Sequence, residues 1–304
     1  MPSLGSFAAT LPRRRNWDEP VRSPALERFY RELMAVEKLP SAPEIARRTL
    51  ATVNRDNANL GDLVTLIARD QALAARLLRI ANGAFYAVRG KVTSIPQAVT
   101  LLGFGRVRDL VLGLSVWGAL EGSSAAARRF RTRLWMHSSM VAAAARMLAV
   151  RTRGDEANAF TAGLLHDVGK LVLGLRLGES YWELLEDADD DGGAAAVETA
   201  SFSCDHATVG AWLLQLWGMP PELVDPVAFH TAPLTPELGL DTINIVAVAD
   251  RLLHATDASS GTAREDVLED LRATVPGIVD GNAWREIWAA LFKEQQSLAT
   301  VFEA

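Results

Sequence analysis

The sequence predicts an all-α protein, a multi-helix bundle with a second helical subdomain packed on it. Apolar residues recur at intervals near 3.6 along most of the 304-residue chain. Capping residues and prolines stand where these segments begin, and no segment alternates as a half-buried strand does. Apolar residues make up 49% and charged residues 22%, a composition that allows a sizeable core without disulfides or metals.

The N-terminal third is expected to be a stack of short helices behind a flexible arm. Residues 1–23 mix Pro, Ser, Gly and three consecutive arginines without apolar periodicity, which predicts the arm. Helical periodicity begins after Pro43. Asn59 and Asp70 stand where helix N-caps are expected.

Two further helices are expected before residue 122. Ser94-Ile95-Pro96 opens the first, because proline is tolerated in the first turn of a helix. Gly103 and Gly105 are expected to break it before the next helix starts near Val107. Residues 24–122 are therefore predicted to form an N-terminal helical subdomain.

Residues 123–304 are predicted to form the main helical bundle, with Gly122-Ser123-Ser124 as the boundary. The acidic segment 186–193 is expected to be a solvated loop. Trp212 and Trp217 lie at near-helical spacing among leucines, which indicates core packing. The expected helices span 125–151, 154–174, 195–201, 205–217, 221–230, 241–256 and 282–302.

Composition and charge exclude several functional classes. A formal net charge of −6 argues against binding DNA directly through overall charge. The single cysteine, Cys204, excludes an internal disulfide and fits a reducing compartment. The longest apolar run, Leu110–Leu120, is too short to cross a bilayer, and the N-terminus does not resemble a secretory signal. We expect a cytoplasmic protein with no membrane partner.

Histidines and aspartates supply the candidate site. Asp250 ends a segment that is apolar on nearly every face, and a carboxylate buried there needs a cation, a metal or several donors. Imidazole and carboxylate groups together suit zinc, iron, manganese or nickel. The other candidates stand inside or at the ends of expected helices: His137, His166, Asp167, His206 and His230.

The order of these residues resembles a known superfamily. The segment Leu164-Leu165-His166-Asp167-Val168-Gly169-Lys170 is similar to the motif of the HD metal-dependent phosphohydrolases. The segments 39–44, 67–82, 98–103, 205–214 and 217–220 look like the HDOD domain, and the resemblance covers about residues 30–255. HDOD proteins are bacterial signalling or regulatory modules, generally regarded as non-catalytic relatives of the HD-GYP phosphodiesterases of cyclic di-GMP.

The resemblance implies a set of metal ligands. His137, His166, Asp167 and Asp250 would hold one divalent ion, and His206 and His230 would serve a weaker second ion. If the site were active, Asp167 and Lys170 would take part in catalysis. His230 is followed by Thr-Ala-Pro, and no Gly-Tyr-Pro occurs in the chain, so hydrolysis of cyclic di-GMP is not expected.

Simpler interpretations stand beside each of these assignments. His166 and Asp167 could be a hydrogen-bonded pair inside a helix, and Lys170 could be solvated or salt-bridged rather than a phosphate contact. His206 could cap its helix or pair with Asp205. His254, four residues after Asp250 on the same helical face, is expected to be a packing or pairing residue.

Two more features favour simple interpretations. A histidine at a helix C-terminus, such as His230, is favoured by the helix dipole alone. The basic cluster Arg128, Arg129, Arg131 and Arg133 could meet a nucleotide or an acidic partner, but such a cluster is more often a solvated face.

These observations predict a signal-transduction or regulatory module that binds a protein partner without turnover. The N-terminal subdomain and its junction with the bundle are the predicted partner site. The alternatives are a metal-dependent phosphohydrolase acting on a nucleotide or phosphoester, and a receptor that binds a cyclic dinucleotide without hydrolysing it.

Overall fold

A computed structural model of the chain describes residues 43–53, 60–82, 91–120, 125–186, 191–234, 241–257, 260–277 and 281–298. Every regular element in these ranges is an α-helix. The only β pairing among them is an isolated bridge between Thr256 and Ala263. The predicted all-α fold class is confirmed. The predicted arm (1–23), the cap at Asn59 and the boundary at 122–124 lie outside the described residues.

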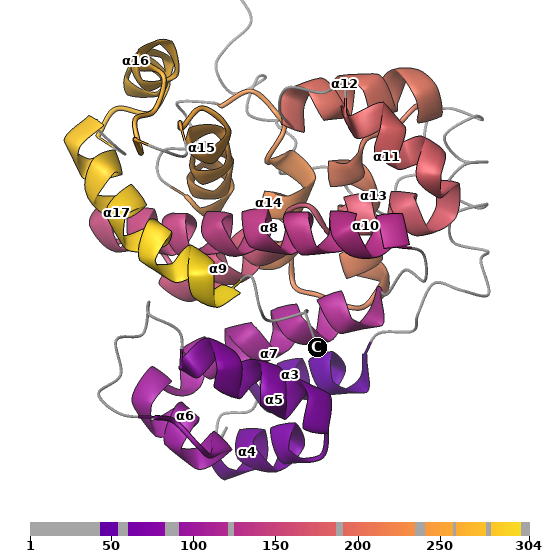
Figure 1. Cartoon of the computed structure of the whole chain (residues 1–304), viewed down its shortest axis with the longest axis vertical. Coiled ribbons are helices and arrows are strands. Elements are labelled where there is room, and N and C mark those ends of the chain that lie inside the picture. Colours follow the sequence, from indigo (N-terminus) through magenta and orange to yellow (C-terminus); the bar gives the residue numbers. More distant parts are fainter. Residues whose placement is uncertain are drawn as a thin grey trace, which may run out of the picture.

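Five helices between residues 44 and 119, called here the N-terminal half, form the lower part of Figure 1. They are α3 (Glu44–Val53), α4 (Leu60–Ala68), α5 (Gln71–Ala81), α6 (Ile95–Leu102) and α7 (Phe104–Ala119). The predicted cap at Asp70 is present, because its side chain accepts a hydrogen bond from the Leu73 amide. Ser94, in the segment predicted to open a helix, caps α6 by accepting a hydrogen bond from the Gln97 amide. Gly103 ends α6 with a φ of 85°, a conformation that favours glycine.

The second half is built around α8 (Ala125–Thr152), which runs across the middle of the molecule in Figure 1. It packs against α9, α15 and α17. The remaining helices are α9 (Glu156–Leu165), α10 (Val168–Leu177), α11 (Glu179–Glu186), α12 (Asp191–Phe202), α13 (His206–Leu216), α14 (Pro221–Phe229), α15 (Thr242–His254), α16 (Glu265–Thr274) and α17 (Gly281–Leu298). Within the described residues, none of these helices is both long and apolar enough to cross a membrane.

Three predicted elements need correction. The single helix expected over 154–174 is two helices, because the chain turns at His166-Asp167 between α9 and α10. Apolar residues continue on both sides of this turn, so periodicity could not reveal it. Gly105 does not break a helix; it lies inside α7. The acidic segment 186–193 is not all loop, since α12 begins at Asp191.

The two halves meet through α7 and α9. Trp117 of α7 is fully buried, and its ring nitrogen donates a hydrogen bond to the carbonyl of Leu164, 3.1 Å away. The guanidinium of Arg131 donates to the carbonyl of Trp117 at 2.7 Å. Arg131 is thus a buried junction residue and not part of a solvated face, although Arg128, Arg129 and Arg133 are exposed. Leu164 lies two residues before His166, so the junction adjoins the candidate site.

Candidate metal centre

All five histidines of the chain converge on one region. They come from five different places in the fold, and Asp167 and Asp250 lie among them. His137 is on α8, His166 is at the turn between α9 and α10, His206 begins α13, His230 follows α14, and His254 ends α15. The fold therefore brings together every predicted ligand.

Three of these histidines are fully buried and oriented by acceptors at Nδ1. The acceptors are the Gly163 carbonyl for His166 (2.7 Å), the Glu198 carboxylate for His206 (2.7 Å) and the Val227 carbonyl for His230 (2.8 Å). In a neutral histidine, a carbonyl or carboxylate acceptor favours the proton on Nδ1, so that Nε2 is the atom that would bind a metal. This arrangement is typical of metal-binding histidines.

The Nε2 atoms of these histidines point toward Asp167. Those of His206 and His230 lie 3.2 Å apart and are 3.3 and 3.7 Å from Asp167 Oδ1. His166 Nε2 lies 3.4 Å from Asp167 Oδ2. Two lone pairs facing each other at this distance need a proton or a metal ion between them. Asp167 Oδ1 is buried and accepts no hydrogen bond of normal geometry, so the donor set fits a divalent ion.

Lys170 neutralises part of this buried charge. Its ammonium lies 2.9 Å from Asp167 Oδ2, and the residue is only 6% exposed, so it is salt-bridged rather than solvated. Burial alone would raise the pKa of Asp167, but the charges of Lys170 and His166 outweigh it and hold the pKa well below its usual range. Asp167 is therefore an ionised ligand candidate.

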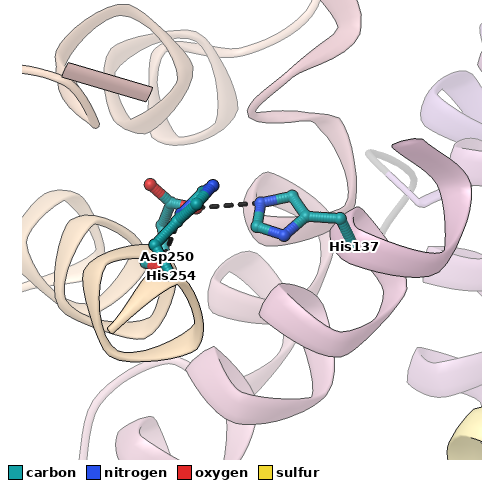
Figure 2. Close-up of side chains that lie close together, drawn as sticks. All are labelled: His137, Asp250 and His254. Carbon is teal, nitrogen blue, oxygen red and sulfur yellow. Dashed lines mark hydrogen bonds and ion pairs between the residues drawn. The ribbon is translucent and has the colours of Figure 1, made fainter. Parts of the chain in front are cut away.

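Asp250 forms the outer part of the region with two histidines (Figure 2). Its Oδ1 lies 2.9 Å from His137 Nε2 and 3.1 Å from His254 Nδ1. Burial would raise the pKa of Asp250, but the two histidines outweigh it and lower the pKa well below its usual value. The side chains of His137 and His254 are 24% and 26% exposed. His254 is thus the expected pairing residue, at the rim of the site.

The ligand atoms fall into three sets, each with its members within 4.8 Å of one another. Asp167 and Asp250 share no set, so the four residues predicted for one ion are distributed over two positions. The sets are His137 with Asp250 and His254; His137 with His166 and Asp167; and Asp167 with His206 and His230.

Glu198 is a site residue that sequence reasoning missed. This α12 carboxylate is fully buried and accepts hydrogen bonds from the Tyr181 hydroxyl (2.6 Å) and from the backbone amide (2.6 Å) and ring of His206. Burial and Lys170 would lower the pKa of His206, but Glu198 and Asp167 outweigh them and raise it. Asp205, one of the alternative partners considered for His206, caps α13 at the Thr208 amide.

Two facing glycines bring α10 and α13 into backbone contact. A Cβ atom at Gly169 would lie 1.9 Å from the His206 carbonyl oxygen and 2.7 Å from the Gly210 nitrogen. Only glycine fits this contact. It places His206 next to the turn that carries His166 and Asp167.

Comparisons with known proteins identify relatives along most of the chain. The HDOD domain matches residues 39–233. An uncharacterised protein of Treponema pallidum is 26% identical over 230 residues, which cover 74% of this chain but only 44% of that protein. A crystal structure of a protein from Shewanella amazonensis SB2B, provisionally named a phosphohydrolase, has a TM-score of 0.69 at 24% identity and covers 92% of this chain and 98% of that one. A protein from Marinobacter aquaeolei VT8, provisionally named a signal transduction protein, has a TM-score of 0.67 at 25% identity; the match covers 92% of this chain and 64% of that one.

Proposed function

Because this chain belongs to the HDOD domain family, we propose that it is a regulatory module of bacterial signal transduction whose His/Asp centre binds divalent metal ions. It acts by binding a protein partner and not by turnover. The name of the Marinobacter relative supports the signalling role.

One observation carries the metal-binding part of this proposal. His166, His206 and His230 each commit Nδ1 to an acceptor and direct Nε2 toward Asp167. A histidine cluster that only filled the core would not need three Nε2 atoms directed at one ionised carboxylate. His137 and Asp250 would complete the ligands, and the mixture of imidazole and carboxylate favours iron, manganese, zinc or nickel.

Burial favours structure or sensing over catalysis. Asp167, His166 and His206 are fully buried and His230 is 1% exposed, so the inner ligands are closed to a bulky phosphoester. An ion there would link α8, the α9–α10 turn, α13 and the end of α14, and it would stabilise the folded state by mass action.

A metal-dependent phosphohydrolase is the second candidate, and Lys170 is the observation that favours it. Its ammonium is held beside Asp167, where it could also contact a phosphate oxygen. A divalent ion in such a centre would supply Lewis-acid activation of water and phosphate. A nucleotide or other phosphoester would be the substrate, and a bound cyclic dinucleotide without hydrolysis is a variant of the same idea.

Metal analysis of protein purified without an affinity-tag metal column tests the proposal. We expect at least one divalent ion per chain, and we expect a chelator to lower the melting temperature. Free ion at a hundredfold excess over Kd stabilises by about 2.7 kcal/mol, which corresponds to roughly 5 °C for a large domain. Absence of metal, with no chelator effect, would contradict metal binding. Metal-dependent release of phosphate, abolished by Asp167→Asn in a folded protein, would favour the hydrolase.

The partner site is proposed on the N-terminal half and its junction with the bundle. This half holds a cavity of about 440 Å³ between α3, α5 and α7, and Leu101 on α6 is 46% exposed. Deleting residues 1–122 would remove Trp117 from the core, so point changes are the better test. We expect Ala72→Glu with Leu101→Glu to abolish capture of protein partners from a bacterial lysate, whereas His166→Gln keeps it. The reverse pattern would contradict this location.

A further inference from the structure

A small pocket lies between the first turns of α7, the C-terminal part of α8 and the start of α9. Its volume is about 140 Å³, and the side chains that line it are those of Arg106, Asp109, Arg146, Glu156, Ala157 and Phe160. Arg146 stands nine residues after His137 on α8, which is about 13 Å along the helix. The pocket therefore shares no residue with the histidine centre and is a separate candidate for a binding site.

The pocket brings opposite charges together from two helices. Arg106 and Asp109 stand one turn apart on α7, and Glu156 and Phe160 stand one turn apart on α9, so each pair shares a helical face. Asp109 accepts a hydrogen bond of 2.6 Å from the guanidinium of Arg108. Among the residues that the structure describes, Arg106 and Glu156 make no ion pair and no side-chain hydrogen bond. The charges of these two side chains are therefore available to a ligand.

Arg146 and Phe160 form a rigid wall of the pocket. The guanidinium carbon of Arg146 lies 5.6 Å from the centroid of the Phe160 ring, which is the distance of a cation–π contact. Both residues are buried. A guanidinium that is already held in place loses less entropy when it approaches a carboxylate. The pocket thus combines donors for a carboxylate, acceptors for an ammonium group and the apolar surface of an aromatic ring.

Charge balance and size together narrow the class of ligand. The lining carries two guanidinium groups and two carboxylates, so a ligand with a net charge would upset their balance, whereas a zwitterion would not. The volume of about 140 Å³ is well below the roughly 300–1,000 Å³ of pockets for drug-sized ligands, which excludes a nucleotide. At roughly 30 Å³ for each water molecule, the pocket has room for about five non-hydrogen atoms. The smallest α-amino acids have this size and carry both charges.

We propose that this pocket binds a small aliphatic α-amino acid, whose carboxylate meets the Arg106 guanidinium and whose ammonium group meets the Glu156 carboxylate. Ala157 and the Phe160 ring contact its apolar part. The inference does not depend on the proposed metal centre. Because α7 belongs to the N-terminal half and α8 and α9 belong to the bundle, the amino acid bridges the two halves and stabilises their junction. It gives the regulatory module an input from a metabolite.

Titration calorimetry with glycine, L-alanine, L-serine and L-valine tests the proposal. Propionate and ethylamine are titrated as well, because each keeps only one of the two charges of alanine. Wild type is compared with Arg106→Gln and Glu156→Gln. The matched controls are Arg133→Gln, which changes an exposed arginine of α8, and Glu222→Gln, which removes an exposed first-turn acid from α14 as Glu156→Gln does from α9. Thermal melting followed by circular dichroism checks that every variant is folded.

We expect at least one of the four amino acids to bind wild type and both controls and to raise their melting temperatures. Arg106→Gln and Glu156→Gln should each weaken this binding about tenfold or more, because each removes a charged hydrogen-bond partner. Propionate and ethylamine should bind at least about tenfold more weakly than the amino acid for the same reason. The inference would be wrong if none of the four amino acids bound, if a singly charged analogue bound as tightly, or if both site variants bound like wild type.

Discussion

The contact between Gly169 and His206 makes the geometry of the candidate metal centre sensitive to a single methyl group. In Gly169→Ala the added Cβ would lie 1.9 Å from the His206 carbonyl oxygen and 2.7 Å from the Gly210 nitrogen. Both neighbours are backbone atoms, so no side chain can rotate away. A normal contact requires α10 and α13 to separate by roughly 1 Å or more, and overpacking of this kind costs about 1–3 kcal/mol or more.

Urea denaturation followed by circular dichroism measures the cost, and a Co²⁺ titration measures the displacement of His206. We expect Gly169→Ala to lose at least about 2 kcal/mol of the free energy of unfolding and to bind the inner Co²⁺ at least tenfold more weakly. Gly105→Ala is the control, because a Cβ at that helical position meets nothing within 4 Å. Its stability should stay within about 0.5 kcal/mol of wild type, because Gly105 is only the second residue of α7 and not in the helix interior. If Gly169→Ala matched wild type in both stability and Co²⁺ affinity, the close-contact argument would be refuted.

Three other predictions each concern one ionisable side chain. Burial, partly offset by Arg108, raises the pKa of Asp109 from 3.8 to about 6. The folded state therefore keeps this proton to higher pH than the unfolded state does. As the pH rises from 4 to 7, the free energy of unfolding of wild type should fall by up to about 3 kcal/mol relative to that of Asp109→Asn. Urea midpoints of the two proteins that stayed parallel over this range would contradict this. Glu198→Gln keeps the size of the side chain but removes the anion that orients His206. It should weaken the Co²⁺ affinity of the site around Asp167, His206 and His230 about 10–100-fold. An unchanged Co²⁺ affinity would show that Glu198 does not orient His206 for metal binding. Burial, with the charges of Asp205 and Glu198, raises the pKa of the Cys204 thiol to about 12, so iodoacetamide at pH 8 should label it only after unfolding; rapid labelling of folded protein would disprove this.

Local signals in the sequence predict much of the fold. Asp70, Ser94 and Asp155 each stand at a helix start and accept hydrogen bonds from the first-turn amides, as such residues do in most proteins. The turn at His166-Asp167 has no comparable signal, because α10 is placed by its contact with α13. The helices α11 and α16 were not predicted either, and α16 is short and mostly polar on its exposed side.

The residues of the candidate site also differ in whether the sequence alone could predict them. Asp250 could be singled out because a carboxylate at the end of an apolar helix needs a partner wherever that helix packs. Glu198 could not, because no local pattern marks it as buried, and its contacts with Tyr181 and His206 come from other helices of the fold. The sequence also could not show that His254 and His137 approach the same oxygen of Asp250, since that contact depends on how α8 and α15 cross.

The charge pairs of the centre differ greatly in sequence separation, and this has a consequence for how the chain folds. Lys170 meets Asp167 from three residues away, whereas His137 and Asp250 are 113 positions apart. The local pair needs only the α9–α10 turn, so we expect it to form early and to neutralise the Asp167 carboxylate before the core closes. The Asp250 contact must wait for closure of a long loop, which is entropically costly and slow. During synthesis, His254 leaves the ribosome after the other four histidines. All the candidate ligands therefore come together only in a chain whose helical bundle has formed.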